Sequence, residues 1–258
     1  MSYVERLFSL TGKTALVTGA SRGLGRGIAR ALLEAGAECI LVSANAERLQ
    51  AAADELSGSG TIAGTFPCDL TSRDQIGGLI ESVKDRCERL DILVNCAGTT
   101  GGYHTFDYPE EEWDRTLRIH VDAPFFLARG LGPLMAEGGG GSIVNITSIN
   151  AERGFPDNPS YVAAKGALKQ LTKGLAEDLG PHGIRVNNVG PGYFRTDMTS
   201  GSWDDAERRA QRSNKTILGR WGEPEDLAGT IILLASNASS YITGQDIYVD
   251  GGWLTRGL

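Results

Sequence analysis

A tyrosine and a lysine four residues apart define the first candidate chemistry in this chain. Tyr161 and Lys165 follow Pro159 in the segment PSYVAAKGALKQLT, and on a helix this spacing puts both side chains on one face. An isolated tyrosine has a pKa of about 10 and transfers protons poorly near neutrality. A lysine ammonium about 4 Å away favours the phenolate by about 4 kcal/mol at an effective dielectric of about 20, roughly three pKa units. The pair therefore predicts a proton-transferring tyrosine, although the spacing also arises by chance on exposed helices.

A serine upstream of this pair could complete a site for a carbonyl group. Ser148 ends the apolar run GSIVNIT and lies thirteen residues before Tyr161. If the run is a strand and the following helix folds back beside it, the hydroxyl can hydrogen-bond a substrate oxygen close to the phenol. A serine at a strand end can equally well cap a turn or helix.

Two small-residue turns predict a site for a flat, phosphorylated ligand. TGASRGLG, residues 18–25, places glycines at 19, 23 and 25 between an apolar run and an amphipathic stretch, where a helix N-terminus favours a pyrophosphate. Its spacing differs from the common G-x-G-x-x-G pattern. DILVNCAG, residues 91–98, leads an apolar run into small residues, at the strand end where open α/β sheets bind ligands. A strand that simply stops at a glycine is the alternative for this second turn.

The elements that must position these residues alternate along the chain. Continuous apolar runs predict strands, and the stretches between them have helical periodicity, which together indicate an α/β fold with a parallel sheet covered on both faces. The segment 197–222 is polar and breaks the alternation, so it is either a lid over a site or a surface excursion. We expect one domain spanning residues 1–258. The predicted strands are 13–18, 38–43, 61–66, 91–95, 141–147, 184–189 and 246–250, and the predicted helices 25–36, 46–56, 73–90, about 109–137, about 159–180 and about 224–236.

Composition narrows the class of protein. The chain has 258 residues, a net charge of −7 and no basic cluster, so we expect no nucleic-acid partner. No apolar run is long enough to span a bilayer, and the N-terminal segment lacks the pattern of a signal peptide, so we expect no membrane partner. The four cysteines form no C-x-x-C pair and no cluster with the three histidines. We therefore expect no metal site and a reducing, cytoplasmic location.

Taken together and in order, these motifs resemble the short-chain dehydrogenase/reductase family in its single-domain form. The resemblance rests on the glycines at 19, 23 and 25, the Asn95 to Gly98 turn, Ser148, the Tyr161 and Lys165 pair, and the Pro191–Gly192 dipeptide. It implies a doubly wound Rossmann-type sheet of seven parallel strands in the order 3-2-1-4-5-6-7. It further implies a nicotinamide cofactor, oxidoreductase activity on a carbonyl or secondary alcohol, and a homotetramer.

Residue by residue, the resemblance implies specific roles. Tyr161 exchanges the proton with the substrate oxygen, Lys165 lowers its pKa and hydrogen-bonds the nicotinamide ribose, and Ser148 orients the carbonyl. Cofactor contacts are implied for Gly19, Ser21, Arg22, Gly23, Leu24, Gly25, Ser43, Asp69, Leu70, Asn95, Ala97, Gly98, Tyr161, Lys165, Pro191, Gly192 and Thr196.

One position departs from the family pattern. An asparagine usually precedes the serine by 28 residues and holds a water in a proton relay, but here the residue is His120. Imidazole also hydrogen-bonds water and titrates near neutrality. We therefore expect His120 to act in the relay with an altered pH dependence, or else simply to pack within its helix.

The second strand favours NADP(H) over NAD(H), although NAD(H) stays possible. No acid stands at Ser43 or Ala44 to repel a 2′-phosphate, and Arg22 in the glycine turn can attract one. Ala44 replaces the arginine that follows the serine in many NADP-dependent members of the family.

The substrate is expected to be a small molecule. PGYFRTDMT and VDGGWL are similar to the branch that acts on sugar acids and polyols, such as gluconate 5-dehydrogenase. For substrate contacts we predict Ser148 and Tyr161, with Arg153 supplying positive charge and Tyr193 and Trp203 lining the pocket. A 3-oxoacyl carrier-protein reductase shares every motif, and a non-catalytic nucleotide-binding regulatory protein is the alternative of another class.

Overall fold

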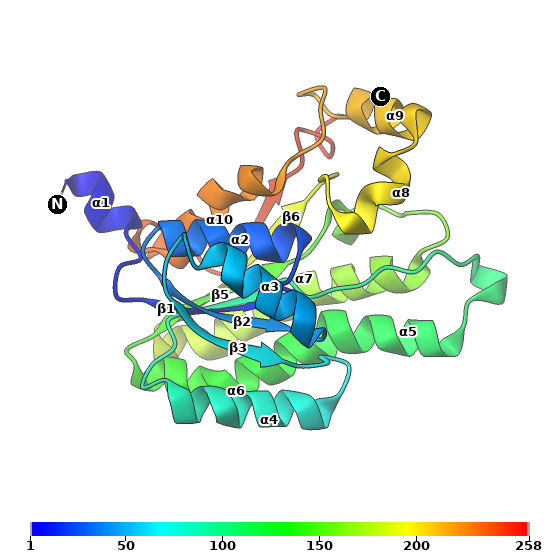
Figure 1. The fold of residues 1–258 in the computed structure, drawn as a ribbon. Coiled ribbons are helices and arrows are strands. Elements are labelled where there is room, and N and C mark those ends of the chain that lie inside the picture. Colours follow the sequence, from blue (N-terminus) through cyan, green and yellow to red (C-terminus); the bar gives the residue numbers. More distant parts are fainter. Residues whose placement is uncertain (1, 257–258) are drawn as a thin grey trace.

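The fold is built on one seven-stranded parallel sheet, seen in a computed structural model that describes residues 2–256 (Figure 1). The strand order is β3-β2-β1-β4-β5-β6-β7, and every neighbouring pair is parallel. The predicted fold class and strand order are confirmed. The strands are β1 (Thr14–Thr18), β2 (Glu38–Ser43), β3 (Ile62–Pro67), β4 (Ile92–Asn95), β5 (Gly141–Ile146), β6 (Ile184–Pro191) and β7 (Asp246–Val249).

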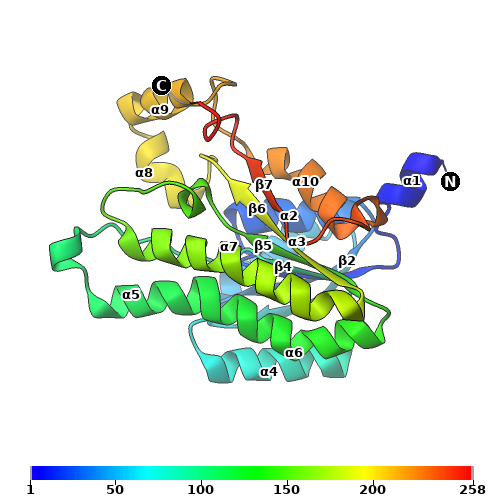
Figure 2. The ribbon, with the colours of Figure 1, turned by 180° about the vertical axis from the view of Figure 1, so that it is seen from behind.

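Helices cover both faces of the sheet, which explains why the inner strands are apolar without alternation. Successive residues of β1 point to opposite faces: Ala15 and Val17 join one buried cluster, and Leu16 joins the other. Figures 1 and 2 show the two helical layers from opposite sides. One layer contains α2 (Gly23–Glu34), α3 (Ala46–Leu56) and α10 (Ala228–Ala235), and the other contains α4 (Arg73–Arg86), α5 (Glu110–Leu117), α6 (Ala123–Glu137) and α7 (Pro159–Leu179).

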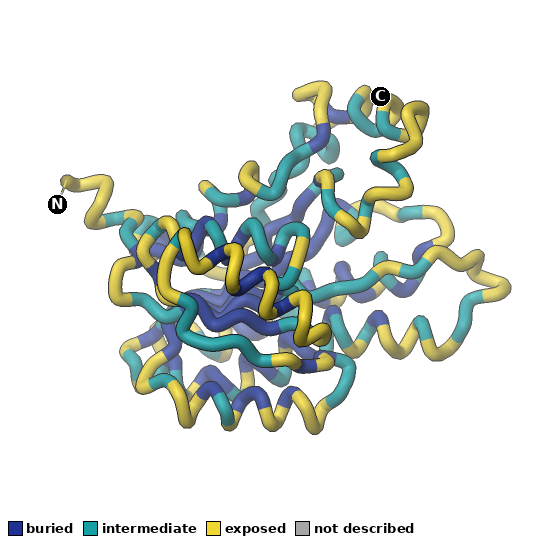
Figure 3. The backbone as a smooth tube through the Cα atoms, in the orientation of Figure 1, coloured by how far each residue is buried: buried dark blue, intermediate teal, exposed yellow. Residues whose placement is uncertain are grey.

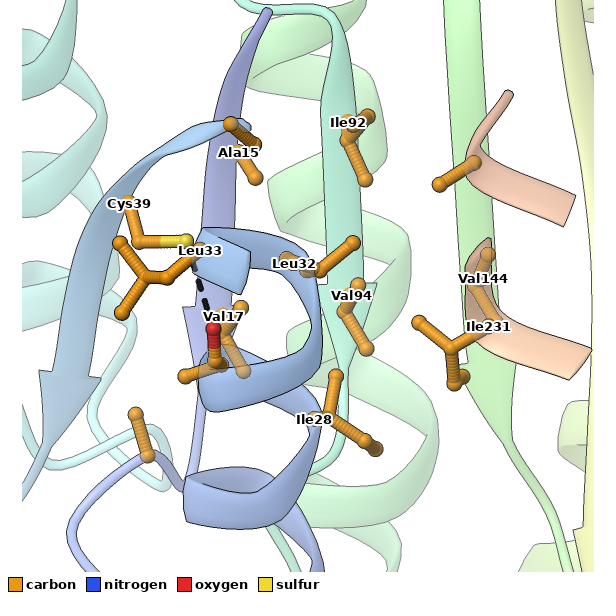
Figure 4. Packing of buried hydrophobic residues seen from close by; sticks show 14 of the residues in the cluster. Ala15, Val17, Ile28, Leu32, Leu33, Cys39, Ile92, Val94, Val144 and Ile231 are labelled. Atoms are coloured by element: carbon orange, nitrogen blue, oxygen red, sulfur yellow. Dashed lines mark hydrogen bonds between the residues drawn. The ribbon is translucent and has the colours of Figure 1, made fainter. Parts of the chain in front are cut away.

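The core between α2 and the sheet holds the glycine turn in place. Ile28 and Leu32 of α2 are fully buried against Val17 and Val94 (Figure 4). Burial of each such side chain contributes about 1.5–3 kcal/mol. The exposed helix faces and the buried sheet are separated clearly along the backbone (Figure 3). The start of α2, and with it the turn that precedes it, is therefore fixed relative to the carboxyl end of β1.

The long helix predicted for 109–137 is interrupted. It consists of α5, a π-helical turn at Arg118–Asp122, and α6. Such turns insert one extra residue into a helix and often occur at functional sites. The six-residue helix α1 (Tyr3–Phe8) was not predicted, although Ser2 and Glu5 form a capping box at its start.

The polar segment 197–222 forms short helices and no strand. It contains a 3₁₀ turn at Asp197–Thr199, α8 (Ser200–Trp203) and α9 (Ala206–Lys215), and a bridge between Phe194 and Gly222 closes its base. No helix in the described range 2–256 is long and apolar enough to cross a membrane. Residues 1, 257 and 258 of the predicted domain lie outside the described residues.

Candidate active site

A cavity of about 510 Å³ opens at the carboxyl ends of the strands, from the glycine turn to α9. This volume is typical of a pocket for a small molecule or cofactor. Sixteen of the seventeen predicted cofactor residues line it, the exception being Asn95. The cavity wall includes Gly19, Ser21, Arg22, Gly23, Leu24, Gly25, Ser43, Asp69, Leu70, Ala97, Gly98, Ser148, Tyr161, Lys165, Pro191, Gly192, Tyr193 and Thr196.

The glycine turn has the shape of a phosphate cradle. Gly19 has a φ of +70°, which favours glycine, and a Cβ there would lie 2.9 Å from the Cα of Ala97. At Gly25 a Cβ would lie 2.2 Å from the carbonyl oxygen of Gly19, so the first turn of α2 can approach only without a side chain. Arg22, at the N-cap of α2, makes no capping side-chain hydrogen bond. The first N–H groups of α2 therefore face the cavity without a side-chain cap, as an anion site requires.

Thr18 connects the glycine turn to the turn that follows β4. Its hydroxyl accepts hydrogen bonds from the backbone N–H groups of Cys96 and Ala97, both at 3.0 Å. Asn95 instead points away from the cavity, and its amide donates to Asn145 at 2.8 Å within the buried interior. The expectation that Asn95 contacts the cofactor is therefore not supported by its position: the strand's pleat turns its side chain toward β5.

At the end of β2, the structure adds a residue that sequence reasoning missed. Ser43 and Ser21 hydroxyls lie 2.8 Å apart, and Arg22 forms an ion pair with Asp197 at 3.4 Å. Arg48 also lines the cavity here, one helical turn after Ala44. The sequence could have indicated Arg48, because a residue in the first turn of the helix that follows β2 lies beside the carboxyl end of that strand.

Ser148, Tyr161 and Lys165 meet at one end of the cavity. Ser148 follows β5, whereas Tyr161 and Lys165 lie on α7. The Nζ of Lys165 lies 5.5 Å from the centroid of the Tyr161 ring and donates to the carbonyl oxygen of Ile146 at 2.6 Å. Ser148 also accepts a hydrogen bond from the N–H of Asn150 at 3.1 Å, so it caps a turn while lining the pocket. The predicted cap is confirmed, and the position of Ser148 at the cavity wall is compatible with its predicted role toward a substrate oxygen.

Desolvation is the main cause of the pKa shifts of Tyr161 and Lys165. It raises the pKa of Tyr161 to about 12, and a hydrogen bond with Ser148 offsets only part of the rise. Burial also lowers the pKa of Lys165 to about 8. We expected the Lys165 ammonium to bring the pKa of the phenol below its ordinary value, but burial shifts that pKa in the opposite direction.

His120 occupies the π-helical turn directly beside Tyr161. Its side chain is only 2% exposed, and its ring meets the Tyr161 ring edge to face with centroids 5.2 Å apart. The Nε2 lies 2.7 Å from the Thr99 carbonyl oxygen and 3.2 Å from the Thr99 N–H. The buried Nδ1 has no hydrogen-bond partner among residues 2–256. His120 thus links the helix to the turn after β4 and retains one free ring nitrogen.

Burial and the Lys165 ammonium lower the pKa of His120 well below its usual range. We expected this imidazole to titrate near neutrality, which is wrong: it is neutral there because the charged form is desolvated and repelled. A neutral ring can still hydrogen-bond a water, so its predicted place in a proton relay does not depend on its titration.

Two predicted substrate residues do not reach the cavity. Tyr193 lines it, but Arg153 is exposed on the loop after Ser148 and Trp203 lies behind the wall, where it packs against Trp221. Arg212 of α9 lines the cavity instead. Asn158 lines the same end, and it is 5% exposed. The sequence alone did not indicate Arg212 because α9 is remote from every recognised motif.

Comparisons with known proteins agree with this geometry. A family model described as Enoyl-(Acyl carrier protein) reductase matches residues 19–254. Gluconate 5-dehydrogenase of Gluconobacter oxydans (strain 621H) is 40% identical over 246 residues, covering 95% of this chain and 96% of its own. The 5-keto-D-gluconate 5-reductase of Escherichia coli (strain K12) is 35% identical over 248 residues, covering 96% and 98%. A gluconate 5-dehydrogenase from Burkholderia cenocepacia J2315, crystallised with NADP and tartrate, superposes with a TM-score of 0.94 at 34% identity and covers 99% of this chain and 100% of its own.

Proposed function

The chain belongs to the short-chain dehydrogenase/reductase family, and from this premise we propose that it interconverts D-gluconate and 5-keto-D-gluconate with NADP(H). It is an NAD(P)-dependent oxidoreductase acting on CH–OH groups. Relatives named for gluconate and 5-keto-D-gluconate, similar over nearly the whole chain, support a sugar acid as substrate.

The observation that carries the proposal is the meeting of three side chains at the end of one cavity. Ser148, Tyr161 and Lys165 come from two elements and converge where the cavity also reaches Gly98 and Pro191. A hydroxyl, a phenol and an ammonium in one desolvated place supply hydrogen bonds and a proton to an oxygen atom.

The site fits a nicotinamide dinucleotide phosphate. The glycine cradle and the uncapped start of α2 suit a pyrophosphate, and Arg22 and Arg48 line the end where β2 stops. Two guanidinium groups without a carboxylate at Ser43 or Ala44 favour a 2′-phosphate. NADP bound in the Burkholderia relative supports the same choice. When bound, this cofactor supplies or accepts the hydride.

In the reducing direction, Tyr161 donates its phenolic proton to the carbonyl oxygen as the carbonyl carbon gains a hydride. Ser148 donates a hydrogen bond to that oxygen and orients it. Lys165 stabilises the phenolate that results, and we propose that His120 accepts a hydrogen bond through Nδ1 from a water that returns the proton. In oxidation, Tyr161 removes the hydroxyl proton while the carbon loses its hydride.

Other readings have less support. A 3-oxoacyl carrier-protein reductase shares the motifs, but the net charge of −7 disfavours docking of an acidic carrier protein. A regulatory protein without turnover has no need for the grouped Ser148, Tyr161 and Lys165. The sugar-acid relatives favour the enzyme reading.

Three finer expectations extend the proposal. We propose that residues 197–222 form a lid on a single domain, because Met198, Thr199, Ser202 and Arg212 line the cavity from that segment. We propose a homotetramer, as the family resemblance implies, in a reducing cytoplasm, as the unpaired cysteines of the sequence favour. Light scattering after size-exclusion chromatography tests the assembly.

The decisive experiment measures NADP⁺ reduction with D-gluconate and NADPH oxidation with 5-keto-D-gluconate. We expect turnover in both directions, and a loss of 10²- to 10⁴-fold in Tyr161→Phe, as expected for removal of a general acid or base. Retained NADPH binding by the variant shows that its site is folded. Absence of wild-type turnover with sugar acids, alongside turnover of 3-oxoacyl thioesters, would overturn the assignment.

A further inference from the structure

Arg212 presents a positive charge at the substrate end of the cavity. It lies on α9 and lines the cavity wall. Its guanidinium carbon is 4.5 Å from the centroid of the Tyr193 ring and 6.0 Å from that of Trp221. Tyr193 in turn packs against Trp221, with centroids 5.2 Å apart. The guanidinium is therefore held over an aromatic surface that is itself fixed by packing.

This charge is not neutralised by the protein. Of the other arginines of the cavity wall, Arg115 pairs with Glu112 at 3.1 Å, Arg22 pairs with Asp197 at 3.4 Å, and Arg48 lies near the end of β2, where we place the cofactor. Among residues 2–256, Arg212 makes no such ion pair. A guanidinium carries five N–H donors, so contact with Tyr193 leaves others available to an anion. The geometry is that of an anion-binding group whose partner is a ligand.

We propose that Arg212 binds the carboxylate of the sugar-acid substrate and makes the enzyme prefer acids over neutral polyols. This inference rests on the proposed function, because it names how that substrate is recognised. Arg212 on α9 thus supplies the positive charge toward the substrate that we predicted for Arg153.

The placement of Tyr193 supports the assignment. Tyr193 and Tyr161 line the same cavity, and Arg212 contacts the Tyr193 ring from α9. In gluconate, four carbon–carbon bonds separate C5 from the carboxylate carbon. A substrate with its C5 oxygen at Tyr161 therefore needs a cation elsewhere on the cavity wall for its carboxylate, and Arg212 supplies one.

The cavity wall also includes a buried polar residue. Asn158 is 5% exposed and lines the cavity, its amide donates to Thr100 at 2.5 Å, and its buried Oδ1 has no partner among residues 2–256. Asn158 is uncharged, so the charge of a sugar acid is left to Arg212.

The test compares D-gluconate with D-glucitol, which carries CH₂OH in place of the carboxylate and is otherwise the same open chain. In Arg212→Gln, kcat/KM for D-gluconate should fall on the order of 10- to 150-fold, the range of a lost hydrogen bond between charged groups, mostly through KM. The value for D-glucitol should change less than about threefold on the same basis, because no such bond is lost. Arg212→Lys should recover part of the loss. Arg208→Gln, on the same helix but outside the cavity wall, makes the same change in net charge and should leave both substrates unchanged.

The outcomes separate this inference from the proposed function. Equal losses with D-gluconate and D-glucitol would show that Arg212 only supports Tyr193, and would overturn the carboxylate assignment alone. A wild-type enzyme that oxidises D-glucitol at least as well as D-gluconate would overturn the preference for acids, whereas only a lack of turnover with D-gluconate would overturn the proposed function. Selective loss with D-gluconate in Arg212→Gln and not in Arg208→Gln establishes the assignment.

Discussion

The imidazole of His120 stands edge-on to the phenol ring of Tyr161, with the ring planes at 90° and the centroids 5.2 Å apart. The π-helical turn at Arg118–Asp122 makes this contact possible, because it carries His120 inward between two helices. His120 also contacts the backbone of Thr99. The residue that departs from the family pattern is thus in contact with the proposed proton donor and with the cavity wall.

The buried state of His120 predicts a specific loss of stability in mild acid. Its folded-state pKa lies well below the ordinary 6.5, so below about pH 6.5 the unfolded chain binds a proton that the folded protein does not. The free energy of unfolding should therefore decrease as pH falls from 7 to 5, by up to about 1.4 kcal/mol per pH unit from this residue. Urea unfolding of the cofactor-free protein at each pH measures it.

His120→Asn removes this contribution and should flatten the pH dependence over the same range. His182→Asn changes an exposed histidine and should leave the wild-type dependence intact. Parallel curves for the wild type and His120→Asn would contradict the assignment of a depressed pKa.

The protonation of Tyr161 predicts that reduction is nearly independent of pH whereas oxidation rises with pH. Because its pKa is about 12 in the free protein, the phenol needed for carbonyl reduction is present throughout the range from pH 6 to 9. Alcohol oxidation needs the phenolate, so its kcat/KM should rise with pH, by up to tenfold per unit. Initial rates with D-gluconate and 5-keto-D-gluconate between pH 6 and 10 test this.

The same pH profiles in Lys165→Met measure the contribution of the Lys165 ammonium to the ionisation of Tyr161. The Nζ lies 5.5 Å from the centroid of the Tyr161 ring. At a charge separation of about that size and an effective dielectric of about 20, the attraction is about 3 kcal/mol, or roughly two pKa units. Oxidation at pH 7 should slow about 100-fold and its rise should move to higher pH, since less phenolate is present. A reduced rate with an unmoved profile would mean that Lys165 acts only through binding.

Arg48 predicts a cofactor preference that can be removed selectively. If Arg48 and Arg22 bind the 2′-phosphate, Arg48→Ala should raise KM for NADP⁺ about tenfold or more, the typical effect of a lost charge-assisted hydrogen bond, with KM for NAD⁺ nearly unchanged. Arg26→Ala is the matched control, because Arg26 pairs with Glu55 at 2.9 Å outside the cavity wall. Equal effects on KM for NADP⁺ and NAD⁺ would show that Arg48 contacts a part of the cofactor that the two molecules share, and not the 2′-phosphate.

The fold was predictable because its signals are local and repeated. The largely apolar run ILVN predicts a buried strand, β4, and the amphipathic pattern of α2 predicts a helix with one buried face. The order of such elements along the chain limits the possible topologies. Ser148 and Tyr161 were also predictable, because each stands at a fixed place relative to β5 or α7.

Residues at the substrate end were less predictable, because long side chains reach the cavity from elements remote in sequence. Arg212 reaches it from α9, whereas Arg153 follows Ser148 closely and still points outward. The neighbouring Glu152 accepts a hydrogen bond from Tyr248 at 2.6 Å, which directs this loop toward β7. Desolvation of Tyr161 and His120 likewise depends on packing between several elements, which spacing along one helix does not reveal.

The fit between His120 and the turn after β4 predicts a pair of substitutions that depend on each other. A Cβ at Gly98 would lie 2.4 Å from the Cε1 of His120, closer than any side chain tolerates, and the φ of Gly98 is not in the left-handed region. Gly98→Ala should therefore lower the free energy of unfolding by about 1–3 kcal/mol through overpacking and slow turnover by displacing His120 from Tyr161. Gly102→Ala, in the same loop with nothing within 4 Å of its added Cβ, should be nearly neutral.

Combining Gly98→Ala with His120→Ala separates a steric clash from other effects of the methyl group. Without the imidazole the new methyl has space, so the double variant should be more stable than the sum of the two single changes predicts, by about 1 kcal/mol or more. Chemical unfolding of the four proteins in a double-mutant cycle measures this coupling. Strict additivity would show that the turn and His120 do not contact each other in solution, and the proposed link from Thr99 through His120 to Tyr161 would then lose its structural basis.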